Sequence, residues 1–175
     1  MIAVMVFSYV IQSVLNSKFD KYSRVASPYN MSGAEIARKM LSDNGITDVK
    51  VEHVKGKLTD HYNPQTKTLN LSDTVYGCSN IAAAAVAAHE CGHAIQHARG
   101  YAPLRLRSSL VPVVSFASSW VQWVLLAGVI FFETFPSLRW LGIGLFAMTT
   151  LFSFVTLPVE VDASRRAVAY LEHSG

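Results

Sequence analysis

The chain has 175 residues, of which 51% are hydrophobic and 15% charged, and its formal net charge is +3. Soluble globular domains carry about 25% charged residues, so this composition argues against an ordinary soluble domain. The weak positive charge includes no run of Lys or Arg with interleaved aromatic residues, which argues against a nucleic-acid-binding protein.

The first segment, Met1 to Leu15, is apolar and uncharged. As a helix it is about 22 Å long, which is shorter than the roughly 30 Å hydrocarbon core of a bilayer. A signal peptide is disfavoured, because no basic residues precede the segment and no A-x-A site follows it. Lys18, Lys21 and Arg24 come directly after it instead. We therefore predict a short or tilted membrane anchor helix over residues 1–16.

Residues 17–109 carry a normal mixture of charges and are predicted to form a polar domain. Ser32 and Glu35 have the spacing of a capping box and Gly45 can end the helix that follows. Extended stretches are expected at residues 48–54, 56–62 and 67–71, with the turn sequence NPQT at residues 63–66 between the last two. We expect a small antiparallel sheet here, within a mainly α-helical chain.

An alanine-rich helix is predicted over residues 81–99, capped by Ser79 or Asn80 and ended by Gly100. Cys91 lies inside this helix. The two cysteines of the chain, Cys78 and Cys91, cannot make a disulfide framework. This indicates a reduced compartment or indifference to redox conditions.

Two membrane-spanning helices are predicted at residues 110–132 and 140–157, which form a transmembrane hairpin around the turn at residues 135–137. Between Leu110 and Leu157 the charged residues are Glu133 and Arg139. The first run would be about 34 Å long as a helix, enough to cross a bilayer with tilt. A chain of this size has too little other protein to bury two such helices.

Positive charge is concentrated at one side of the predicted membrane segments. The residues are Lys18, Lys21, Arg24, Arg99, Arg105, Arg107, Arg165 and Arg166. By the positive-inside rule, we expect a multi-pass protein of the cell membrane whose polar domain faces the cytoplasm.

His89, Glu90 and His93 form an H-E-x-x-H motif. Residues four apart lie on one face of a helix, so both imidazoles can bind one zinc ion. Glu90 then lies beside the metal and can act as a general base toward water activated by zinc. The alternative is a helix with scattered polar residues, but the neighbouring sequence is nearly uncharged, where unpaired polar groups are costly.

A catalytic zinc needs a third protein ligand. His97 is close in sequence but drifts around the helix from His93, and Gln96 and Arg99 stand where a metzincin needs Gly and His, which excludes that class. Glu160 and Asp162 follow the second predicted span, in residues 158–175, which we expect to form a separate helix that carries the third ligand. Glu160 is favoured because on a helix it shares a face with small residues, whereas Asp162 shares its face with Arg165 and Arg166.

The sequence resembles the YugP-like neutral zinc metallopeptidases of bacterial membranes. The matching stretches are LTDHYNP at Leu58–Pro64, LNLS at Leu69–Ser72, AAHECGHAIQHARGYAPLRLRS at Ala87–Ser108 and TLPVEVDASRRA at Thr156–Ala167. The resemblance implies a transmembrane zinc hydrolase with an acidic ligand after a membrane hairpin. It also implies further sequence beyond Gly175, so we expect either a short member or a fragment.

A more distant similarity is to HtpX-type and prenyl-protein-processing membrane metallopeptidases, and it implies that Glu160 is the third ligand. Those relatives have an Asp four residues later, where this chain has Ser164. A carboxylate that supports a zinc-binding histidine is therefore expected from Asp60 or Asp162, without a choice between them.

The predicted strands can pair with an extended substrate, as sheet edges do in zinc peptidases. Asp60, His61 and Tyr62 lie there, and His61 or Tyr62 is a candidate donor to the oxyanion. The alternative is that these residues only form the polar approach to a turn.

Taken together, these features predict a membrane-embedded zinc metallopeptidase with an α+β domain, one Zn²⁺ per chain and a peptide or protein substrate associated with the membrane. Quality control or processing of membrane proteins is a role expected by analogy. A catalytically silent zinc-binding scaffold and a metal-free membrane protein are the alternatives. The ligand set does not distinguish zinc from manganese, cobalt or iron.

Overall fold

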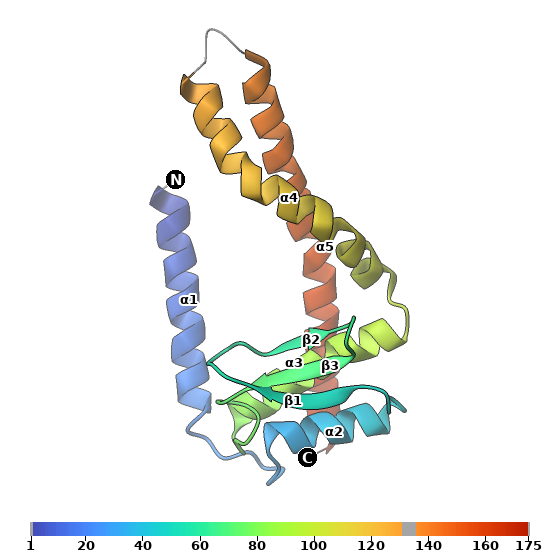
Figure 1. Cartoon of the computed structure of the whole chain (residues 1–175). Coiled ribbons are helices and arrows are strands. Elements are labelled where there is room, and N and C mark those ends of the chain that lie inside the picture. The colour runs from blue at the N-terminus through green and yellow to red at the C-terminus, as the bar shows by residue number, and fades with distance from the viewer. Residues whose placement is uncertain (1, 131–135, 175) are drawn as a thin grey trace. The chain divides into compact units, whose positions relative to one another are not determined.

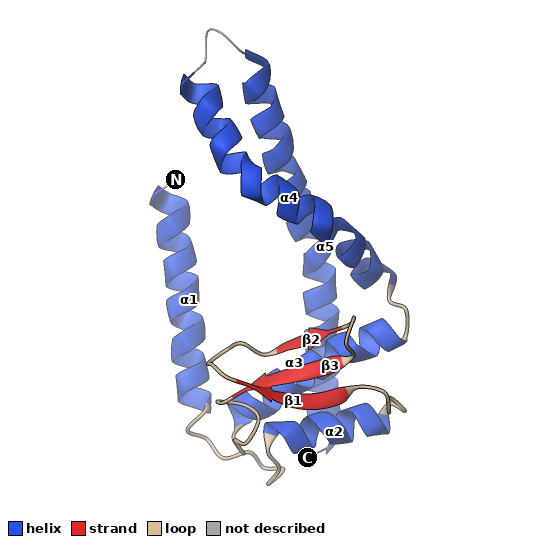
Figure 2. Ribbon diagram, viewed as in Figure 1, coloured by secondary structure: helices blue, strands red, loops and turns tan. Residues whose placement is uncertain are grey.

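The computed structural model describes residues 2–130 and 136–174, and it is mainly helical with a small sheet, as predicted (Figures 1 and 2). In chain order the elements are α1 (Ile2–Tyr22), α2 (Gly33–Asp43), β1 (Lys50–Val54), β2 (His61–Asn63), β3 (Thr68–Ser72), α3 (Ile81–Ala98), α4 (Ala102–Ile130) and α5 (Pro136–Ser174). Internal contacts divide the chain into two compact units, Met1–Ala98 with Ala163–Gly175, and Arg99–Asp162. The boundary between them therefore falls inside the continuous helix α5.

The described part of the chain contains a mixed sheet with the strand order β1-β3-β2. β2 and β3 pair antiparallel as the predicted hairpin, and the side chain of Asn63 accepts the N–H of Gln65 at 2.9 Å in the turn. β1 pairs with β3 in parallel, however, so the sheet is not antiparallel throughout. The reason is that β1 and β2 flank β3 instead of pairing with each other.

Local signals set the ends of α2 and α3. Ser32 and Glu35 form the predicted capping box, in which the Ser32 N–H donates to the Glu35 carboxylate at 2.7 Å. Asn80 is the cap of α3, since its side chain accepts the Ala83 N–H at 2.8 Å. Gly45 follows α2 with a φ of 72°, a conformation that glycine adopts without strain.

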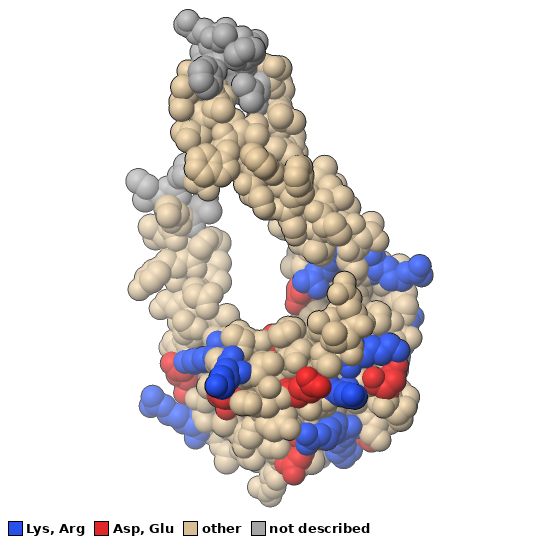
Figure 3. Space-filling view, in the orientation of Figure 1, with Lys and Arg blue, Asp and Glu red and all other residues tan. Residues whose placement is uncertain are grey.

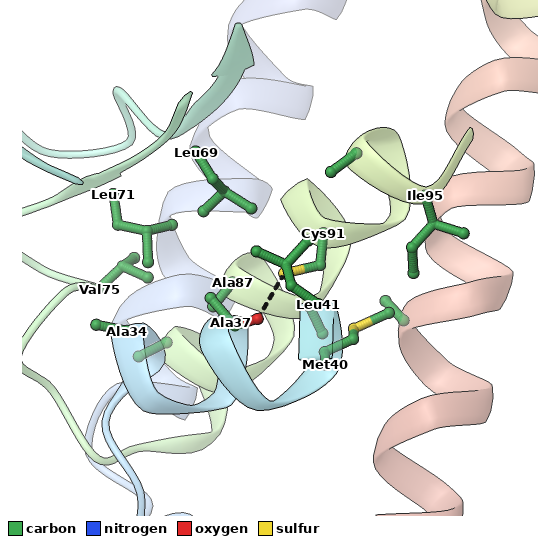
Figure 4. Close-up of a cluster of buried hydrophobic side chains, with 14 of the residues drawn as sticks. Ala34, Ala37, Met40, Leu41, Leu69, Leu71, Val75, Ala87, Cys91 and Ile95 are labelled. Carbon is green, nitrogen blue, oxygen red and sulfur yellow. Dashed lines mark hydrogen bonds between the residues drawn. The ribbon is translucent and has the colours of Figure 1, made fainter. Parts of the chain in front are cut away.

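The core of the first unit lies between α2, α3 and β3, and it is built largely from alanines facing leucines (Figure 4). Ala37, Ala87, Leu69 and Leu71 are fully buried. The Cys91 thiol is also buried and donates to the carbonyl oxygen of Ala37 at 3.5 Å. Small side chains let α2 and α3 approach closely, and each buried leucine contributes about 1.5–3 kcal/mol of transfer free energy. Because this packing buries one face of α3, a functional site on the helix has to use the remaining face.

Within the described residues, two helices are long and apolar enough to cross a membrane, over Ala102–Gly128 and Trp140–His173. Only 12% and 6% of their most apolar windows are buried by protein, unlike the core helices of a soluble protein. In the view of Figure 3, the charged side chains gather over the sheet and its neighbouring helices, while α4 and the first half of α5 present a largely uncharged surface. This exposed apolar surface favours association with a membrane.

The helices differ from the predicted spans at two places. α4 begins at Ala102, so Arg105 and Arg107 belong to it. α5 runs without interruption from Pro136 to Ser174, with Pro158 inside it, where the sequence had indicated the start of a separate helix. A proline removes one main-chain hydrogen bond, which a long helix can tolerate. Of the turn predicted at residues 135–137, Pro136 and Ser137 are the first residues of α5 instead. Phe135 and Glu133 lie outside the described residues.

Candidate metal centre

His89 and His93 lie one turn apart on α3, as the motif predicted, with Glu90 beside them. Their rings are 4.8 Å apart and nearly perpendicular, at 86°. All three side chains are partly buried on the face of α3 that does not contact α2. Two imidazoles held in this way can offer their nitrogens to a single ion.

Each histidine has a partner for its Nδ1 atom. His89 Nδ1 lies 3.2 Å from the Ser164 hydroxyl, and His93 Nδ1 lies 3.1 Å from the Gln96 side-chain oxygen. A hydrogen bond at one ring nitrogen selects the tautomer and orients the other nitrogen for a metal. In the tautomer in which Nδ1 carries the proton and donates to these oxygens, the Nε2 atom of each ring is left to bind a metal.

Gln96 was not identified from the sequence as a functional residue. It is fully buried, three residues after His93 on the same helix. Its signal in the sequence is a single polar amide in the apolar stretch AIQHA, at a spacing that places it next to His93. A buried amide of this kind needs a partner, and His93 provides one.

The close contact between α3 and α5 places Ser164 beside His89. A β-carbon added to Gly92 would lie 2.7 Å from the carbonyl oxygen of Ala163 and 3.0 Å from its α-carbon. Ala163 and Ala167 are buried, which confirms the prediction that small residues on this face of α5 allow a close helix contact. Only glycine fits at residue 92 without moving one of the two helices.

Glu160 lies on α5 one turn before Ser164, so helix geometry directs both side chains to the same face. One donor atom from each of His89, His93 and Glu160 lies within 4.8 Å of the other two. For comparison, donors on a tetrahedral zinc ion are about 3.3 Å apart. Two imidazole nitrogens and a carboxylate oxygen are also a donor set that zinc prefers, and the residues therefore fit the ion.

The other candidate ligands lie elsewhere. His97 Nδ1 is 2.9 Å from the Tyr62 hydroxyl. Asp162 is not part of the three-residue group found among the described residues. Asp60 accepts the Ser72 N–H at 2.7 Å and the Ser72 hydroxyl at 3.0 Å, so it fastens the approach to β2 onto β3. The residue found next to His89 is Ser164, at the position where the distant relatives have an Asp.

The Glu90 carboxyl is largely enclosed, and burial raises its pKa above the ordinary value. His93 and His89 oppose this shift in pKa, and Asp60 adds to it. The main-chain N–H of Tyr62 donates to Glu90 Oε2 at 3.1 Å and fixes the carboxylate. A raised pKa brings a carboxylate closer to the range in which it accepts and returns a proton near neutral pH.

The two predicted oxyanion donors have other partners in this structure. His61 Nδ1 lies 2.8 Å from the Thr59 carbonyl oxygen, and His61 Nε2 lies 3.2 Å from the Asn70 amide. The Tyr62 hydroxyl contacts His97, while its main chain contacts Glu90. A role for either side chain at the oxyanion stays a prediction.

Cys91 separates Glu90 from Gly92, but its side chain belongs to the core. Burial raises the pKa of this thiol, which keeps it protonated. A metal-binding cysteine is a thiolate, so the chemistry of Cys91 does not suit a ligand.

Comparisons with known proteins show the family of the chain. Residues 1–175 match the family described as "Putative neutral zinc metallopeptidase". The chain is 42% identical over 176 residues to "Putative membrane protease YugP" of Bacillus subtilis (strain 168), and the alignment covers 99% of this chain and 76% of that protein. No solved structure matches. The resemblance expected from the sequence is confirmed, and the chain belongs to this family of neutral zinc metallopeptidases.

Proposed function

We propose that the chain is a zinc-dependent peptidase that binds one Zn²⁺ through His89, His93 and Glu160 and hydrolyses peptide bonds with Glu90 as the base. One observation carries the proposal: donor atoms of the three ligands lie within 4.8 Å of one another, beside a carboxylate that is buried and held in place. A site that only stabilised the fold would have no use for that carboxylate.

A zinc ion at this position supplies a Lewis acid that polarises the scissile carbonyl and makes water a stronger nucleophile. Glu90 takes the proton from the attacking water and returns it to the leaving amine. The Tyr62 N–H occupies Oε2, and we assign the proton transfer to Oε1. Ser164 and Gln96 hold the two imidazoles in their metal-binding tautomer.

β2 lies at an edge of the sheet, next to Glu90, and we propose that it pairs with an extended substrate. His61 and Tyr62 remain the candidate donors to the oxyanion. The Tyr62 hydroxyl would have to leave His97 to serve in that role, since the two atoms are 2.9 Å apart.

We further propose that α4 and α5 both cross the cell membrane, that the site faces the cytoplasm, and that the substrates are membrane-associated proteins. The exposed apolar surfaces of α4 and α5 and the name of the similar "membrane protease" support a membrane location. The concentration of Lys and Arg on one side of the helices supports the orientation.

The proposal is tested by comparing wild type with Glu90→Gln on solubilised membrane proteins, with newly formed N-termini identified by amine labelling and mass spectrometry. Wild type with zinc should generate new N-termini, and Glu90→Gln should generate almost none. Glu52→Gln, at an exposed glutamate of β1, is the matched control and should behave as wild type. Equal cleavage by Glu90→Gln, or none by fully zinc-loaded wild type, would overturn the proposal.

A further inference from the structure

A cleft of about 540 Å³ opens within the first unit, beside the candidate catalytic residues. It lies between the second half of α1, the loop that leads into β2, and the first turns of α3. Its lining residues are Gln12, Leu15, Leu58, Asp60, Ala85, Val86, His89 and Glu90. A space of this size accommodates side chains of a bound peptide.

On α3, the residues that line the cleft one turn before the candidate catalytic residues are apolar and have small side chains. Ala85 and Val86 come one helical turn before His89 and Glu90, so each lies on the same face as the residue four positions later. Ala85 is exposed, and its short side chain leaves room that a larger residue would fill. The space is therefore adjacent to the atoms that would carry out hydrolysis.

Leu58 lines the cleft with an unusual main-chain conformation. Its φ is 57°, in the left-handed region that branched side chains rarely adopt. Asn or Gly would relieve this strain, so the leucine at this position costs the backbone free energy. Strain of this kind is concentrated at functional sites, where a particular side chain is needed at a particular place.

The loop that carries Leu58 is fastened to α1, so the two walls of the cleft are linked. Lys57 forms an ion pair with Asp20 at 2.8 Å and lies over the ring of Phe19. Phe19 is buried and anchors this end of α1 in the first unit. Leu15 lies one turn earlier on α1 and also lines the cleft, with 53% of its surface exposed.

We propose that this cleft holds an aliphatic side chain of the substrate next to the scissile bond, with Leu15 of α1 and Leu58 as specificity-determining residues. The inference rests on the proposed function of the adjacent site. An aliphatic residue loses water on entering the cleft and contacts both leucines. An acidic residue is rejected, because Asp60 already supplies a carboxylate to the same cleft. The helix α1 thus contributes to substrate choice.

The test uses two fluorescein-labelled peptides of serine and glycine that differ only at one central residue, which is Leu in one and Asp in the other. Their dissociation constants are measured by fluorescence anisotropy with the zinc-loaded, detergent-purified full chain carrying Glu90→Gln, so that no cleavage intervenes. The Leu peptide should bind at least tenfold more tightly than the Asp peptide. Binding that does not differ between the two peptides, or that is absent for both, would overturn the inference.

Two further substitutions locate the preference in the cleft. Leu58→Asn keeps the size of the side chain and suits the left-handed backbone, and Ala85→Leu fills the cleft from α3. Each should reduce the Leu-to-Asp preference to about twofold or less with thermal unfolding unchanged. Lys67→Asn is the matched control, because Lys67 also has a positive φ, 51°, but lies outside the cleft. A preference that survives Leu58→Asn and Ala85→Leu would overturn the assignment.

The two proposals fail in different ways. If cleavage depends on Glu90 but shows no preference for aliphatic residues at the cut sites, the cleft proposal is wrong and the peptidase proposal stands. Selective binding of the Leu peptide by a protein that never cleaves would leave the cleft as a binding site and remove the peptidase.

Discussion

Gly92 of α3 lies so close to Ala163 of α5 that a β-carbon at residue 92 would be 2.7 Å from the Ala163 carbonyl oxygen. This contact brings Ser164 to His89, and Glu160 precedes Ser164 by one turn of the same helix. The glycine in the H-E-x-x-H motif therefore has a packing role: it lets the helix with the two histidines approach the helix with the proposed ligand Glu160.

Gly92→Ala should push the two helices apart. We expect the free energy of unfolding to fall by about 1–3 kcal/mol, as for overpacking elsewhere, and the zinc content to fall with it. Thermal unfolding and metal analysis check both effects. Gly77→Ala is the control, because no atom lies within 4 Å of the added carbon at that residue, and it should retain stability and zinc. Full zinc occupancy in Gly92→Ala would contradict the role given to this contact.

Replacing the partners of the histidines should weaken zinc binding and leave the fold intact. Ser164→Ala removes the hydroxyl 3.2 Å from His89, and Gln96→Met removes the amide 3.1 Å from His93. Each change should lower zinc affinity about 10–100-fold, the usual effect of losing such a partner. Competition with a chelating dye measures the affinity. Ser164→Asp restores the carboxylate of the distant relatives and should bind zinc at least as tightly as wild type. Unchanged affinity in both Ser164→Ala and Gln96→Met would mean that the imidazoles are oriented by other groups.

Tyr62 is attached to α3 at two points two turns apart, through its N–H at Glu90 and through its hydroxyl at His97. Tyr62→Phe removes the second attachment and should lower the free energy of unfolding by about 1 kcal/mol. It should also speed hydrogen exchange at the amide of residue 62, with zinc content unchanged. Tyr9→Phe, at an exposed position of α1, is the control and should change neither quantity. Unaltered exchange at residue 62 would show that the hydroxyl does not hold the strand on Glu90.

Acid should weaken the loop that carries Leu58. The Gly56 N–H and then the His53 imidazole hold the pKa of the Asp73 carboxyl below its usual value. A carboxylate with a lowered pKa stabilises the folded state above its unfolded pKa of about 3.9, and that contribution is lost as the pH falls through the folded value. The difference in urea midpoint between wild type and Asp73→Asn should therefore be largest near neutral pH and shrink below about pH 4. A difference independent of pH would contradict this assignment.

Features that depend on neighbouring residues could be predicted from the sequence. The capping box at Ser32, the Asn80 cap and the two histidines on one face of α3 follow from spacing within a helix. Glu160 could be selected as the candidate ligand because an acid at the edge of an apolar segment needs a partner, and because small residues share its face.

Features that depend on contacts between distant segments could not be predicted. The bond from the Tyr62 N–H to Glu90 is made by the main chain, so no side-chain pattern indicates it. The parallel pairing of β1 with β3 depends on β3 lying between β1 and β2 in the sheet. Residues 158–175 were expected to form a helix separate from the second span, yet α5 continues through Pro158. The role of Gln96 beside His93 could not be predicted either, because it depends on the burial of that face of α3.

The central claim is that Glu160 completes the metal site with His89 and His93. The most direct test is zinc content per chain, measured by elemental analysis of detergent-purified full chain for wild type, Glu160→Gln and Asp162→Asn. We predict about one zinc in wild type and in Asp162→Asn, and a loss in Glu160→Gln that exceeds the roughly 10–100-fold effect of a supporting residue on affinity. Zinc retained by Glu160→Gln, or absent from reconstituted wild type, would contradict the account.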